Sequence, residues 1–93
     1  MKLKPLAPID KINASARNNL TRIKGVVSAS GGATFTTDRS AGFTYGLSVV
    51  LESKEALAEY AKDPIHVEFV TSLIAPYKEE GAGAIVAVDY EIS

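Results

Sequence analysis

The chain has no cysteine and no tryptophan, and its 93 residues contain a single histidine. The lack of cysteine excludes disulfides and thiol catalysis and is typical of a reducing compartment, so we expect a cytoplasmic protein. One histidine with scattered carboxylates is a poor ligand set for a transition metal. It also leaves no Ser-His-Asp arrangement around a nucleophile elbow. We therefore expect neither a metal nor another cofactor.

Long apolar runs and a strong net charge are also missing. No stretch approaches the length that crosses a bilayer, so no membrane span is expected. The formal net charge of −1 gives no electrostatic support for binding nucleic acid. A composition of 46% hydrophobic and 23% charged residues is that of an ordinary globular protein, which at this length forms one domain over residues 1–93.

Hydrophobic periodicity predicts alternating helices and strands. Short apolar repeats indicate helices, strict alternation indicates strands, and Gly25, Asp63-Pro64 and Gly81 mark boundaries. The order predicts an α+β fold in which helices cover one face of an antiparallel sheet. The expected elements are a strand end at 1–4, helices at 8–24, 53–62 and 64–76, and strands at 26–35, 43–51 and 85–92.

Two of the expected strands carry more apolar surface than one helical layer obviously needs. Leaving such a surface in water would forfeit several kcal/mol at roughly 25 cal/mol per Å². We therefore expect a homodimer that packs sheet face against sheet face. The residues concerned are Phe43, Tyr45, Leu47, Val49 and Leu51 on one strand and Val86, Val88, Tyr90 and Ile92 on the other.

The single histidine, His66, lies on the helix that opens at Pro64. At about 100° per residue it shares the inward side of that helix with Val70 and Leu73. An imidazole that faces apolar surroundings is either a structural hydrogen-bonding group or the acid–base element of a cavity. The residues alone leave both readings open and slightly favour the structural one.

The segment 42–69 resembles the Dabb family, the stress-responsive dimeric A/B-barrel proteins. The similarity rests on the Gly42-Phe-Thr strand start, the Glu52-Ser helix entry and above all the sequence Tyr60-Ala-Lys-Asp-Pro-Ile-His66-Val. The resemblance implies a ferredoxin-like subunit whose sheet pairs with that of a second copy to close a barrel. Here the first strand of the family is short or missing, because only residues 1–4 correspond to it.

The resemblance also implies a chemistry. Assigned enzymes of the family include a cofactor-free plant polyketide cyclase, and its catalytic tyrosine and histidine match Tyr60 and His66. A cyclase or lyase would then act on an apolar carbonyl compound in a pocket walled by Tyr45, Val70 and Leu73. The family commonly has a second histidine where this chain has Tyr45. The alternative is a stress-related or ligand-carrying dimer without catalysis, in which His66 is structural.

Overall fold

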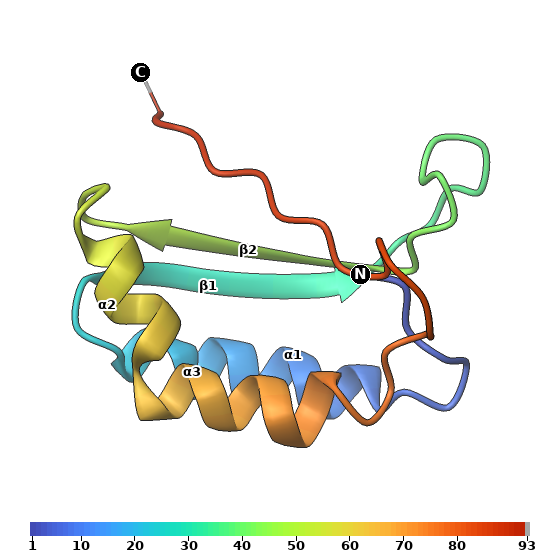
Figure 1. The fold of residues 1–93 in the computed structure, drawn as a ribbon, viewed down its shortest axis with the longest axis horizontal. Coiled ribbons are helices and arrows are strands. Elements are labelled where there is room, and N and C mark those ends of the chain that lie inside the picture. Colours follow the sequence, from blue (N-terminus) through green and yellow to red (C-terminus); the bar gives the residue numbers. More distant parts are fainter. Residues whose placement is uncertain (93) are drawn as a thin grey trace.

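The computed structural model describes residues 1–92 as helices packed on a short antiparallel sheet (Figure 1). A 3₁₀ turn extends the first helix, and a π-helical turn extends the last one. The elements are α1 (Ile9–Asn18), η1 (Leu20–Arg22), β1 (Val26–Ala33), β2 (Tyr45–Leu51), α2 (Ala56–Lys62), α3 (Pro64–Phe69) and η2 (Val70–Ile74). Their order and type agree with the periodicity of the sequence, apart from the two ends of the chain.

The sheet consists of β1 and β2, which pair antiparallel from Val26↔Leu51 to Ala33↔Tyr45. A register shift between Val26 and Ser28 adds one residue to β1. The sheet has helices on one side only, with α1 and α3 lying beneath the strands in Figure 1. This arrangement is the α+β architecture that the alternation of elements predicts.

The core lies between the helices and this face of the sheet. Ile12, Ala16 and Leu20 are fully buried along α1 and η1, as their helical spacing predicts. Tyr45 is buried from the sheet side, while Leu47 and Val49 pack against the same cluster. The apolar alternation of β2 therefore faces the helices, and Gly46 and Ser48 on the opposite face of the strand are exposed.

The break between α2 and α3 follows the predicted capping chemistry. The Asp63 side chain accepts a hydrogen bond from the backbone N–H of Ile65 at 2.9 Å, and Pro64 occupies the first helical turn. Both choices suit a helix start, because the cap satisfies a free N–H and proline has none to lose. The chain thus ends α2 and starts α3 within one residue.

The helix that follows Pro64 does not keep an α-helical period. Its buried residues are Phe69 and Ile74, at the two ends of the η2 π turn. A π turn contains an extra residue per turn and rotates the residues beyond it around the helix axis. The predicted inward positions Val70 and Leu73 are partly buried and pack against the core cluster, while Phe69 and Ile74 are buried most deeply.

The two chain ends depart from the prediction. Residues 1–4 contribute a single β-bridge, Leu3↔Lys78, and the predicted last strand is wrong because Ile85–Ile92 is extended without strand pairing. A strand needs a hydrogen-bonding neighbour, and residues 1–4 are too few to supply one along the whole segment. Large apolar side chains of this segment are exposed as a result, including Val88 at 79% and Tyr90 at 78%.

Candidate functional site

His66 and Tyr60 come together across the α2–α3 break. Tyr60 lies in the last turn of α2 and His66 in the first turn of α3. Their ring centroids are 4.5 Å apart, and the ring planes are inclined by 44°. The Asp63-Pro64 break therefore turns a separation along the sequence into direct contact between the two groups that the sequence motif singles out.

The orientation of the imidazole is fixed by the backbone. His66 Nδ1 lies 2.9 Å from the carbonyl oxygen of Ala61. A carbonyl can only accept a hydrogen bond, so Nδ1 carries a proton and the neutral ring has its lone pair on Nε2. Within residues 1–92 this nitrogen has no hydrogen-bond partner, and the side chain is partly exposed at the helix start. The arrangement leaves Nε2 free to accept a proton.

Tyr60 supplies a phenol at the edge of the core. Only 9% of the residue is exposed, and burial raises the pKa of its hydroxyl above the ordinary value for tyrosine. A raised pKa keeps the phenol protonated, so at neutral pH it can donate a hydrogen bond. The Tyr60 hydroxyl has no hydrogen-bond partner among the described residues. Because every fully buried side-chain polar atom in this part of the chain has such a partner, the hydroxyl is in contact with solvent.

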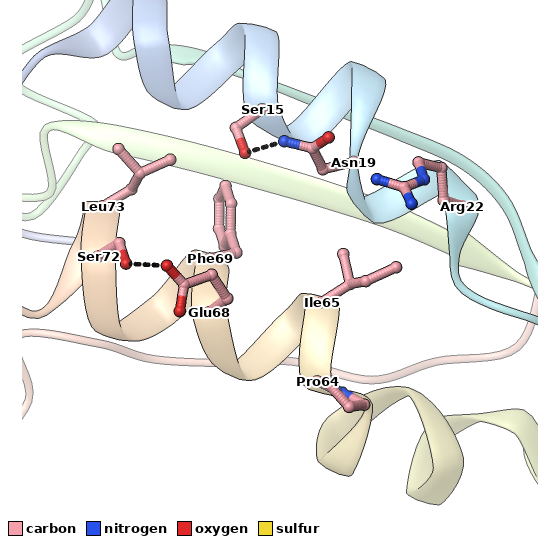
Figure 2. Close-up of a pocket in the computed structure, with 9 residues that line it drawn as sticks. All are labelled: Ser15, Asn19, Arg22, Pro64, Ile65, Glu68, Phe69, Ser72 and Leu73. Atoms are coloured by element: carbon pink, nitrogen blue, oxygen red, sulfur yellow. Dashed lines mark hydrogen bonds between the residues drawn. The ribbon is translucent and has the colours of Figure 1, made fainter.

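A groove of about 450 Å³ lies between α1–η1 and α3 and includes Pro64 and Ile65 at the start of α3 (Figure 2). Ile65, Phe69 and Leu73 form its apolar floor, and polar side chains line its rims. Ser72 Oγ donates to Glu68 Oε1 at 2.6 Å on one side, and Asn19 Nδ2 donates to Ser15 Oγ at 2.9 Å on the other. Arg22 adds a positive charge at one end of the groove.

The pocket expected from the sequence is only partly reproduced. Leu73 lines the groove, whereas Val70, Tyr60 and His66 are not among its lining residues. Tyr45 lies elsewhere, with 1% of its surface exposed. The structure therefore brings His66 and Tyr60 together and places Leu73 nearby, but it does not gather all five predicted residues around one hollow.

Tyr45 has a partner that sequence reasoning missed. Its hydroxyl donates to Asn13 Oδ1 on α1 at 2.7 Å, and burial raises the pKa of the hydroxyl. The ring crosses over Gly31 on β1, where an added Cβ would overlap the tyrosine hydroxyl and approach its Cζ to 2.8 Å. The available signals were an asparagine beside the buried stripe of α1 and a glycine inside a strand.

The described residues contain no group of three or more His, Asp or Glu side chains placed to hold a metal ion. None of the helices in this part of the chain is long and apolar enough to span a membrane. The imidazole of His66 and the phenol of Tyr60, in contact at the edge of the apolar core, define the candidate site.

The comparisons with known proteins identify the class to which this fold and motif belong. The family described as Stress responsive A/B Barrel Domain matches residues 1–92. The chain belongs to this Dabb family, whose fold is ferredoxin-like α+β and whose members are generally dimeric.

A solved structure supports the same assignment. The crystal structure of At3g17210 from Arabidopsis thaliana is 25% identical, with a TM-score of 0.77. The similarity covers 98% of this chain and 87% of the plant chain. No curated protein matches the sequence.

Proposed function

We propose that this protein is a small homodimeric Dabb-type enzyme that works without a cofactor, as a cyclase or lyase on an apolar carbonyl compound. His66 is the base and Tyr60 the oxygen partner. The proposal is carried by one observation: the two rings are in contact, and the Nδ1–Ala61 hydrogen bond leaves the lone pair of the neutral imidazole on Nε2.

The two groups have complementary roles in such a reaction. Nε2 takes the proton from a carbon next to the substrate carbonyl, and the electron pair of that C–H bond moves into an enolate. The Tyr60 phenol donates a hydrogen bond to the enolate oxygen and stabilises the negative charge that develops there. The enolate carbon then bonds to a second carbonyl of the same molecule, and the resulting alkoxide takes the proton back from the imidazolium.

The surroundings favour an apolar substrate. Tyr60 belongs to the buried core cluster, and Ile65, Val70 and Leu73 pack against that cluster beside it. Low local polarity strengthens the hydrogen bond from the phenol to an enolate. We further propose that two copies associate through their sheet faces and that the protein acts in the cytoplasm. Both statements rest on family membership and on the composition of the chain.

The enolisation step can be tested without the natural substrate. We expect the protein to accelerate exchange of the α-protons of a long-chain methyl ketone, 2-nonanone, in D₂O, followed by NMR. His66→Ala should abolish the acceleration, and Tyr60→Phe should lower it by about 10²-fold, in line with the loss of one oxyanion donor. Circular dichroism and sedimentation should show that both variants stay folded. Full exchange activity in a folded His66→Ala protein would contradict the proposal.

A second function is favoured by the same hydrogen bond. Because His66 bonds to Ala61 across the α2–α3 break, it can serve to hold the two helices together in a non-catalytic, stress-responsive or ligand-binding dimer. In that case His66→Ala should lower the free energy of unfolding by more than about 2 kcal/mol, as loss of a bonded group does when its partner is left unpaired. Unchanged stability with lost α-proton exchange would support the enzyme.

A further inference from the structure

The groove between α1–η1 and α3 contains an unpaired positive charge. Within residues 1–92 the ion pairs are Lys54 with Glu91 and Lys62 with Glu59, so the guanidinium of Arg22 has no acidic partner. The acidic side chain of the groove, Glu68, already accepts a hydrogen bond from the Ser72 hydroxyl at 2.6 Å. The charge that the groove leaves open to a ligand is therefore positive.

A second donor lies next to this guanidinium. Asn19 and Arg22 are three residues apart where α1 continues into η1, and both line the groove. Asn19 Nδ2 donates one of its two hydrogens to Ser15 Oγ at 2.9 Å, which leaves the other hydrogen unused. A guanidinium fork with a neighbouring amide N–H is a donor set suited to a carboxylate, which accepts through two oxygens.

An apolar strip begins beside this donor pair and runs along α3 and η2. Ile65, Phe69 and Leu73 line the groove at intervals of four residues. Figure 2 shows Arg22 at the end where Ile65 lies, with Leu73 at the opposite end. From Ile65 to Leu73 the strip is about 12 Å long, at a rise of about 1.5 Å per residue. That length corresponds to an extended medium-chain alkyl group.

We propose that this groove is a binding site for a medium-chain carboxylic acid, with the carboxylate on Arg22 and Asn19 and the alkyl chain over the strip from Ile65 to Leu73. The groove volume of about 450 Å³ lies within the range of small-molecule sites, about 300–1,000 Å³. The carboxylate keeps its distance from Glu68, whose oxygen is turned toward Ser72 (Figure 2).

This site is distinct from the candidate active site. Neither Tyr60 nor His66 lines the groove, and the bound acid is not the carbonyl compound of the proposed function. The two proposals therefore stand or fall separately. His66→Ala should leave binding of the acid unchanged, whatever it does to α-proton exchange.

The first test varies the ligand in isothermal titration calorimetry at neutral pH. Decanoate, below its micelle-forming concentration, should bind saturably at one site per chain. Decanol has the same chain without the charge and should bind at least about 10-fold more weakly, because its hydroxyl does not form charge-assisted hydrogen bonds to Arg22. Butyrate keeps the charge but covers little of the strip, and it should bind at least about 100-fold more weakly. Equal affinities for decanoate and decanol would overturn the proposal.

The second test varies the protein. Arg22→Gln should weaken decanoate binding by at least about 10-fold and leave decanol binding unchanged. The matched control Arg17→Gln removes the same charge from an exposed position on α1 outside the groove, and it should weaken decanoate by less than about 2-fold because solvent screens distant charges. Equal losses in the two variants would show that decanoate responds only to net charge, which contradicts the site.

The third test locates the ligand. In ¹H–¹⁵N NMR spectra decanoate should shift the amide signals of residues 15–22 and 64–73 and leave those of the exposed segment 85–92 unmoved. Shifts confined to 85–92 would indicate adsorption to the exposed apolar side chains there and would overturn the proposal. So would binding that His66→Ala abolishes and Arg22→Gln does not, because the carboxylate would then lie at the candidate active site.

Discussion

Two tyrosines of this chain occupy contrasting environments. Tyr45 is enclosed between α1 and the sheet, and its hydroxyl is satisfied by Asn13. Tyr60 lies at the edge of the same core, with its ring against the partly exposed His66. Burial raises the pKa of both hydroxyls. Both phenols are therefore protonated at neutral pH, although one is hydrogen-bonded inside the core and the other is not.

A raised pKa does not by itself show whether a tyrosine hydroxyl can donate a hydrogen bond to a ligand. The Tyr45 hydroxyl has already used its proton in a hydrogen bond inside the protein, so it has none to offer a ligand. The Tyr60 hydroxyl has no hydrogen-bond partner among residues 1–92, and its ring lies against the ring of His66, whose Nε2 is likewise unbonded. Availability of the proton, rather than the pKa direction, separates the structural tyrosine from the candidate catalytic one. Four variants test this separation.

The largest effect should come from truncating the enclosed tyrosine. Tyr45→Ala removes a fully buried ring and should lower the free energy of unfolding by about 3–5 kcal/mol, as aromatic-to-alanine changes in protein cores do. Urea denaturation followed by circular dichroism measures the change. A loss below about 1.5 kcal/mol would show that the surroundings of Tyr45 collapse easily and that the ring is not a core element.

The glycine beneath the same ring should be nearly as sensitive. In Gly31→Ala the new Cβ would overlap Tyr45 and lie 3.0 Å from the carbonyl oxygen of Gly46, so the strands or the ring must shift. We expect a destabilisation of about 1–3 kcal/mol, the usual range for overpacking. In a Tyr45→Leu background the added cost of Gly31→Ala should fall. Additive losses in the double variant would indicate that the two residues do not meet.

Loss of the Asp63 cap of α3 should lower both stability and activity. Asp63→Ala removes the hydrogen bond to the Ile65 N–H and should cost about 1 kcal/mol. This bond fixes the start of α3 and with it the position of His66. The rate of α-proton exchange of 2-nonanone should therefore fall even under conditions where the variant is fully folded. Asp38→Ala, in the exposed loop before β2, is the control and should change neither quantity. Equal effects from Asp63→Ala and Asp38→Ala would show that the Asp63 cap does not position His66.

The smallest effect should appear at alkaline pH. The pKa of Tyr60 is raised in the folded protein, so its stabilising contribution is fully present below the unfolded value of about 10 and is lost as the pH rises through the folded value. Tyr60→Phe should therefore flatten the decline of stability above about pH 10 and change little below pH 9. Chemical denaturation at both pH values provides the measurement, and an unchanged alkaline slope would contradict it.

Sequence patterns predicted those parts of the fold whose cause is local. The buried stripe Ile12–Ala16–Leu20, the Asp63-Pro64 helix start and the alternation of β2 all follow from spacing and capping. The contact of Tyr60 with His66 followed from the break and the family motif. The catalytic role proposed for this contact came from the resemblance to the family and not from periodicity or capping.

The remaining features depend on neighbours distant in sequence. Periodicity showed that residues 85–92 can form a strand, but strand pairing requires a partner that residues 1–4 supply only at one end. The bond from Tyr45 to Asn13 joins β2 to α1, and no local signal specifies such a pair. Val70 and Leu73 pack against the core as predicted, but the deepest burial falls on Phe69 and Ile74, and a constant helical period does not anticipate the π turn between them.

That π turn has a consequence for insertions and deletions in this chain. It holds one residue more than an α-helical turn needs, and its ends carry the buried Phe69 and Ile74. Removing the exposed Thr71 would return the stretch to ordinary α-helical winding while both anchors keep their sides. A one-residue deletion between Pro64 and Phe69 would instead rotate the start of α3, with His66, by about 100° relative to Phe69 and Ile74. A one-residue deletion should therefore be tolerated at 70–74 better than elsewhere along this helix.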